Sequence, residues 1–142
     1  MLIEGFISME DSGIPTFAVK HPDAKWDEVL LSGFLSSIND FFKQALDSGY
    51  LSNIQFQEKQ VFFSFSSRLK IKFALIANKL IPNNIAEYCL NELQEQYMTF
   101  FIEGKKMKAI TESQSEDFSK NIAYPTIEKW ETKAMDLRDS LE

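Results

Sequence analysis

The sequence predicts a single α+β domain in which a five-stranded antiparallel sheet carries helices on both faces. The expected elements follow the order strand, strand, helix, three strands, helix, helix, and only short links join consecutive strands, which favours antiparallel neighbours. One strand, residues 69–77, becomes apolar on both sides toward its end, so helices should cover each face of the sheet there. At 142 residues the chain also has the usual size of one domain.

Five segments alternate apolar and polar residues in the manner of strands. They are residues 2–9, 16–20, 50–57, 61–67 and 69–77. The turn-forming sequence at residues 11–15 joins the first two into a hairpin. Pro22 follows the second strand, which ends there because proline cannot donate to a strand ladder.

The clearest helical pattern covers residues 27–46. Its apolar residues recur every three or four positions, which predicts that they form the face packed on the sheet. They are Leu31, Phe34, Leu35, Ile38, Phe41, Phe42 and Ala45. Asp23 and Asp27 are both candidates for the N-cap. Gly33, inside the helix, suggests close approach of a neighbouring strand.

Helical patterns also fill the C-terminal part of the chain. Residues 84–101 form the second long helix, and Asn84 and Glu87 have the spacing of a capping box. After a polar connector, Ser113 and Glu116 offer a second capping box before the last helical stretch. The chain is therefore divided into a core, residues 1–102, and a connector with a C-terminal helical segment packed on the same domain, residues 103–142.

Composition excludes several classes of partner. The chain has 15 basic and 21 acidic residues, a formal net charge of −6, and so lacks the positive surface on which nucleic-acid binding depends. The longest uncharged run, residues 29–39, falls short of the roughly 20 residues that a membrane span needs. The single cysteine, Cys89, rules out an internal disulfide. We therefore expect a cytoplasmic protein that binds no nucleic acid, has no transmembrane anchor and reaches membranes only through a partner.

The sequence holds no recognisable catalytic constellation. The only histidine, His21, precedes Pro22 at a strand end, and Cys89 lies on the apolar stripe of its helix. One histidine and one cysteine cannot form a tetrahedral zinc site. The five glycines are too scattered to build a phosphate-binding loop. We therefore predict no enzymatic activity, no catalytic residue, no cofactor and no metal.

Aromatic residues are the remaining signal. The chain has 13 phenylalanines, most of them on expected core faces. Those assigned to the core are Phe34, Phe41, Phe63, Phe73 and Phe100. Trp26 before the first helix, Phe62 on the serine-bearing side of its strand and Trp130 on the last helix fit the core less well. Exposed aromatic side chains are typical interface anchors, so these three are candidate interface residues, although helices on both faces could equally bury Phe62.

Two local motifs resemble the longin family. Residues 11–17, Asp-Ser-Gly-Ile-Pro-Thr-Phe, are similar to the first hairpin of longin-like and roadblock-like domains. The stretch Leu-Ser-Gly-Phe-Leu-Ser-Ser-Ile at residues 31–38, followed by Asp40 and Phe41, resembles the first helix of archaeal longin-like proteins. The resemblance extends over residues 2–101. The roadblock fold places a helix before its first strand, whereas this chain begins in a strand, which favours longin.

The resemblance implies a five-stranded antiparallel sheet in a non-enzymatic module of membrane-trafficking complexes or of small-GTPase regulation. Such domains are often dimers, so the partners it implies are a second copy, another longin-like or roadblock-like chain, or a small GTPase. Unlike longin SNAREs, this sequence shows no long coiled coil or membrane anchor after the domain. We expect a scaffold or regulator. The alternative is a small-ligand sensor of the profilin or PAS type, which would need a roomy pocket.

The strand at residues 50–57 has the polar composition of a sheet edge. Its candidate interface residues are Tyr50, Ser52, Asn53, Gln55 and Gln57. An exposed edge presents unpaired N–H and C=O groups that another copy can satisfy by continuing the sheet. We therefore predict a homodimer built on this strand and on the exposed flank of the helix at residues 27–46.

Overall fold

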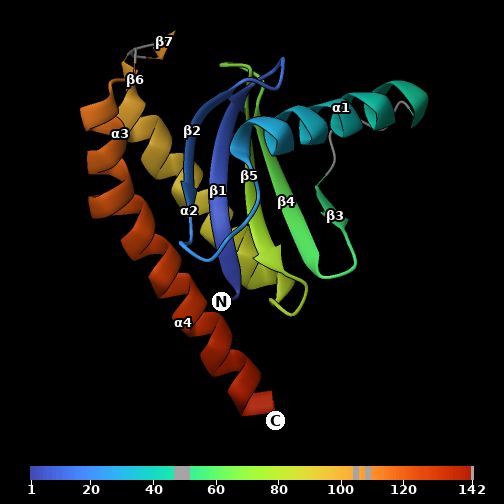
Figure 1. Cartoon of the computed structure of the whole chain (residues 1–142), viewed down its shortest axis with the longest axis vertical. Coiled ribbons are helices and arrows are strands. Elements are labelled where there is room, and N and C mark those ends of the chain that lie inside the picture. Colours follow the sequence, from blue (N-terminus) through green and yellow to red (C-terminus); the bar gives the residue numbers. More distant parts are fainter. Residues whose placement is uncertain (47–51, 104–105, 108–109, 142) are drawn as a thin grey trace.

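The computed structural model describes residues 1–46, 52–103, 106–107 and 110–141. Its main sheet has five strands, and every neighbouring pair is antiparallel (Figure 1). In order across the sheet, the strands are β2 (Pro15–Lys20), β1 (Ile3–Glu10), β5 (Ile71–Asn78), β4 (Lys59–Ser66) and β3 (Asn53–Gln55). The predicted fold class is confirmed.

Helices cover both faces of this sheet (Figure 1). Helix α1 (Glu28–Leu46) lies on one face, and α2 (Asn83–Phe101) lies on the other. The chain then continues through α3 (Glu112–Phe118), a π-helical turn η1 (Ser119–Ala123) and α4 (Tyr124–Leu141), which pack beside α2. A small hairpin of β6 (Ile102–Glu103) and β7 (Lys106–Met107) also forms, which the sequence had not predicted.

The larger hydrophobic core fills the space between the sheet and α2, and it is built around a cluster of aromatic rings in T-shaped and tilted contacts. Tyr97 of α2 is fully buried, with its ring centroid 5.4 Å from Phe73 and 4.8 Å from Phe101. Phe118 of α3 closes this cluster against Phe17 of β2 at 5.1 Å. Such pairs add about 0.5–1.5 kcal/mol each beyond the area that they bury. The C-terminal helices are thus part of the same core as the sheet.

Strand β5 is central and buried on both faces, as its sequence pattern predicted. Ile71, Phe73 and Leu75 point into the core under α2, whereas Ala74 and Ile76 belong to a smaller cluster under α1. The two sides of the sheet therefore differ greatly in the amount of apolar surface that they bury.

The predicted face of α1 is correct only in part. Phe34 and Phe41, assigned to the core, are 49% and 64% exposed. Leu35 is buried as predicted, but the other buried positions described on α1 are three polar residues, Ser32, Ser36 and Asn39. The helix is turned in this way because the sheet presents a buried lysine to it, as described below. The side chain of Phe42 lies outside the part of the chain that the structure describes.

The close approach expected at Gly33 is also wrong, since a Cβ there would meet nothing within 4 Å. The constrained glycine is Gly13, in the β1–β2 turn. Its φ of +96° disfavours any other residue, and an added Cβ would lie 3.0 Å from the Ser36 Cβ. The turn, rather than a strand, comes close to α1.

The capping predictions are confirmed only in part. Asp27 caps α1, since its carboxylate accepts the Leu30 N–H at 2.9 Å. Helix α2 has Pro82 at its N-cap without a side-chain hydrogen bond, so the capping box predicted there is wrong. The box predicted at Ser113 and Glu116 occurs two residues earlier, where Thr111 and Gln114 bond each other reciprocally at 3.2 Å.

We expect Phe73→Ala to lower the free energy of unfolding by about 3–5 kcal/mol, because it leaves a cavity in the ring cluster. Phe73 is fully buried and stacks on Phe6 at 5.9 Å. Urea denaturation followed by circular dichroism measures the loss. The control is Ile14→Ala at the exposed hairpin tip, which should stay within about 0.5 kcal/mol of the parent protein. A midpoint unchanged by Phe73→Ala would contradict this face of β5.

Candidate protein-interaction surface

Helix α1 is attached to the sheet through a buried lysine. The side chain of Lys72, on β5, is only 3% exposed. Its Nζ atom donates to the Ser36 hydroxyl at 2.9 Å, to the Asp11 carbonyl at 3.1 Å and to the Asp40 carboxylate at 3.1 Å. These three acceptors satisfy all three N–H groups of the ammonium. One side chain therefore ties β5, the β1–β2 turn and α1 together.

Serine side chains add two further bonds between α1 and the β1–β2 turn. Ser32 donates to the Gly13 carbonyl at 2.9 Å, and Ser36 donates to the Asp11 carbonyl at 3.1 Å. Leu35 lies between these serines in sequence and is fully buried against the sheet. The side of α1 that faces the sheet is therefore mostly polar, and the two serines each have a specific partner.

The consequence is an apolar surface on the other side of α1. Leu30, Phe34 and Phe41 are spaced four and seven residues apart, which places them on one helical face. They are 75%, 49% and 64% exposed. Phe56, just after β3, is 36% exposed and lies 6.4 Å from Phe34 between ring centroids. We call these four residues and the adjacent edge of β3 the α1/β3 surface.

A small apolar pocket of about 240 Å³ opens into this surface. Its lining includes Trp26, Phe34, Phe56 and Val61. Trp26 packs closely on the backbone of Gly5, where an added Cβ would lie 2.7 Å from the indole ring. The indole Nε1 is buried and has no hydrogen-bond partner among the described residues. The walls of the pocket are thus apolar, and the unsatisfied donor is buried rather than exposed to the pocket.

The edge of β3 is open, because β4 is its only neighbour in the described sheet. The Phe56 N–H donates to β4, and the Ser52 carbonyl accepts a hydrogen bond from β4. Every second residue of this segment is therefore hydrogen-bonded to β4. By the alternation of an antiparallel ladder, the N–H and C=O groups of Asn53 and Gln55 point away from β4. These groups are available to another strand.

The predicted interface residues are distributed unevenly over this region. Ser52, Gln55 and Gln57 are exposed and Asn53 is half-buried, all at the open edge; Tyr50 lies outside the described residues. The strand is shorter than the predicted residues 50–57. Trp26 is half-buried in the apolar pocket. Of the two interpretations of Phe62, burial is the one observed, with only 1% of the residue exposed on the α2 side of the sheet.

Trp130 is held within a contact network on α4. Its Nε1 donates to the Glu92 carboxylate, and its ring lies 5.8 Å from that of Tyr88. The ammonium of Lys133 sits 4.5 Å from the ring centroid. Burial raises the pKa of Glu92, but hydrogen bonds from Lys129 and Trp130 outweigh this effect and bring the pKa below its usual value. Trp130 therefore braces α4 against α2.

Leu30 and Phe56 were not among the predicted interface residues, and Phe34 and Phe41 were predicted to lie in the core. Helical spacing shows that the residues share a face but cannot show which way the face points. Two features of the sequence could have indicated the direction of the face. One is a second, polar stripe on the same helix, formed by Ser32, Ser36 and Asn39, and the other is a lysine within a mostly apolar strand.

The two candidate reactive side chains are placed unfavourably for chemistry. Burial raises the pKa of the Cys89 thiol to about 12, so almost no thiolate exists at neutral pH. His21 lies in the loop after β2, where its Nδ1 accepts the Asp23 N–H at 3.1 Å. Within the described residues, no group of three or more His, Cys, Asp or Glu side chains is arranged to hold a metal. None of the described helices has the length and hydropathy required to span a membrane.

Comparison with known proteins identifies the fold. A roadblock/LC7 domain from Streptomyces avermitilis superposes with a TM-score of 0.55 at 12% identity, over 70% of this chain and 86% of that one. The gliding protein MglB from Thermus thermophilus gives a TM-score of 0.50 at 8% identity, over 61% of this chain and 68% of that one. No protein-family model and no curated protein sequence matches the chain. The fold is longin-like and related to the roadblock domain.

We expect Lys72→Met to lower the free energy of unfolding by about 1–3 kcal/mol. The reason is that the Ser36 hydroxyl, the Asp11 carbonyl and the Asp40 carboxylate lose their donor. Hydrogen exchange should accelerate more in α1 than in α2, since the ring cluster is untouched. Lys79→Met is the matched control, because Lys79 is exposed and, among the described residues, pairs only with the exposed Glu58 at 3.6 Å. Uniform acceleration across both helices would contradict a local role for Lys72.

Proposed function

We propose that the chain is a non-enzymatic protein-interaction module that acts as a homodimer through the α1/β3 surface. The single observation that carries this proposal is the outward apolar face of α1 beside an open strand edge. Monomeric proteins rarely expose contiguous apolar patches of this kind, and such patches usually mark interaction sites. The strand edge adds directional hydrogen bonds to the apolar contact.

An isologous dimer uses both features at once. Pairing two β3 strands about a two-fold axis joins the outward N–H and C=O groups of Asn53 and Gln55 with those of the second copy. The same axis brings the two α1 helices together on one face of the continued sheet. Leu30, Phe34 and Phe41 then have an apolar partner.

The wider role that we propose is a scaffold or regulator in a small-GTPase or membrane-trafficking-like assembly in the cytoplasm. The longin resemblance and the roadblock-related fold support this partner class. The alternative function, a small-ligand sensor, has weaker support because aromatic rings fill the space between the sheet and α2.

We expect Asn53→Pro to convert the dimer into a folded monomer. The substitution removes a donor that points away from β4, so the internal ladder stays intact. Light scattering coupled to size-exclusion chromatography measures the mass, and circular dichroism checks the fold. Ile54→Pro is the matched control, because it removes a donor directed at β4 and should destabilise the domain itself.

A second pair of substitutions tests the helical half of the surface. Phe34→Ser with Phe41→Ser should weaken self-association by at least about tenfold, since both side chains are largely exposed and their loss leaves the core unchanged.

If Asn53→Pro remains dimeric with an intact dichroism spectrum, the interface lies elsewhere, and α4 with Trp130 becomes the next candidate. A parent protein that stays monomeric at high micromolar concentration would contradict the homodimer directly.

The GTPase proposal has a separate test. Purified small GTPases, loaded with GDP or with a non-hydrolysable GTP analogue, are titrated against the dimer by calorimetry. Binding that depends on the nucleotide would support a regulator. If neither the GDP-loaded nor the GTP-analogue-loaded protein binds while the dimer stays intact, the GTPase partner is rejected. The proposal of self-association is not affected by that result.

A further inference from the structure

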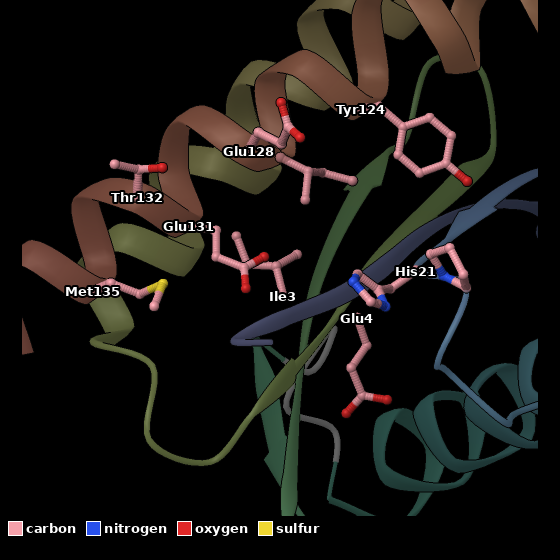
Figure 2. A pocket seen from close by; sticks show the side chains of 10 residues that line it. Ile3, Glu4, His21, Tyr124, Glu128, Glu131, Thr132 and Met135 are labelled. Carbon is pink, nitrogen blue, oxygen red and sulfur yellow. The ribbon is translucent and has the colours of Figure 1, made fainter.

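A groove of about 570 Å³ lies between α4 and the strands at the N-terminal end of the chain (Figure 2). Ile3 of β1 and Ile127 of α4 form its buried apolar base, and Pro22 contributes from the loop after β2. Tyr124 and Met135, which are 40% and 48% exposed, stand at its two ends along α4. The groove lies on the opposite side of the sheet from α1, and none of its residues belongs to the α1/β3 surface.

The groove is long rather than round. From Tyr124 to Met135 a helix rises about 16 Å, which matches the length of about five residues in an extended peptide. Apolar contacts at the two ends and along the base suit alternate side chains of such a segment. A compact small molecule would use only part of this length.

Two carboxylates on α4 give the groove its charge. Glu131 accepts the Leu2 N–H at 2.8 Å, and this bond fixes its carboxylate beside Ile3 (Figure 2). It also lies 3.7 Å from the α-ammonium of Met1. Glu128, one turn earlier, is exposed and makes no hydrogen bond or ion pair with the described residues. The groove therefore holds more negative charge than its neighbours neutralise.

Three other polar residues of the groove are already engaged. The Glu4 carboxylate pairs with Lys59 at 2.5 Å. His21 is bonded to Asp23 through Nδ1 at 3.1 Å, and Tyr124 donates its hydroxyl proton to the Lys20 carbonyl at 2.9 Å. Among the described residues, the group of the groove that still lacks a cation is Glu128, one turn from Glu131.

We propose that this groove binds an extended segment of a partner protein that carries a lysine or arginine between apolar residues. A lysine or arginine side chain can lay its apolar stem against a hydrophobic surface and keep its charged head at the rim. In the groove, Ile3 and Ile127 would contact the stem, and the carboxylates of Glu128 and Glu131 would contact the head. Arginine can satisfy a fixed carboxylate with two parallel hydrogen bonds. The inference does not depend on the dimer, because it uses a different face of the molecule.

The test is a titration of the isotope-labelled full chain with acetylated, amidated pentapeptides Ala-Leu-X-Leu-Ala, in which X is Arg, Lys, Gln or Glu. We expect the Arg and Lys peptides to shift the amide resonances of Ile3, Glu131 and Thr132. The Gln peptide should bind at least about fivefold more weakly, a difference typical of partly exposed ion pairs. The Glu peptide should not bind.

The variant Glu128→Gln with Glu131→Gln should reduce Arg-peptide affinity to that of the Gln peptide. A glutamine at position 131 keeps a carbonyl that accepts the Leu2 N–H, so the fold should be preserved. The matched control is Glu112→Gln with Glu116→Gln, which removes the same charge from exposed positions on α3 and should leave binding unchanged.

Three outcomes would overturn the proposal. The first is equal binding of the Arg and Gln peptides, or no binding of any peptide to the parent protein. The second is a shift pattern centred on the α1/β3 surface. The third is binding of 1,4-diaminobutane as tightly as the Arg peptide, which would make the groove a small-amine site. None of these results bears on self-association through β3.

Discussion

The buried ammonium of Lys72 determines how α1 lies on the sheet. A buried charge is tolerated only when it is paired and fully hydrogen-bonded, so the helix must offer oxygen atoms to this point of β5. Ser36 and Asp40 do so from α1, and Asp11 does so from the β1–β2 turn. Once these contacts are made, Phe34 and Phe41 must face solvent, because they lie on the opposite side of the helix. The α1/β3 surface therefore follows from a polar constraint in the core.

Different interactions consequently hold the helices on the two faces of the sheet. Under α2, α3 and α4, the rings of Phe6, Phe73, Tyr97 and Phe118 are fully buried and supply most of the apolar packing. Under α1, the cluster is small, and directed hydrogen bonds hold the helix in place. A face that contributes little to global stability is free to expose apolar groups for a partner.

Sequence patterns predicted the elements that depend on local periodicity. The succession of strands along the chain and the two buried faces of β5 follow from the alternation of apolar and polar residues. The rotation of α1 could not be predicted in this way, because its apolar arc is wide and helical spacing gives no direction in space. Lys72 sits 32 residues after Asp40, so their pairing is a property of the folded sheet. The groove beside α4 was equally inaccessible, since it joins Ile3 to Glu131 across nearly the whole chain.

The sheet has two edges, and among the described residues the C-terminal helices lie beside only one of them. Beside β2, Phe118 packs on Phe17 at 5.1 Å, and Tyr124 donates to the carbonyl of Lys20 at 2.9 Å, so α3 and α4 flank this edge. Beside β3, β4 is the only described strand that pairs with it. A protein with two free edges can extend its sheet indefinitely, which is a route to aggregation. With one free edge, pairing about a two-fold axis consumes the edge of both copies and stops at two. In the dimer that we propose, α3 and α4 beside β2 thus limit self-association to two copies, while α4 also forms one wall of the second groove.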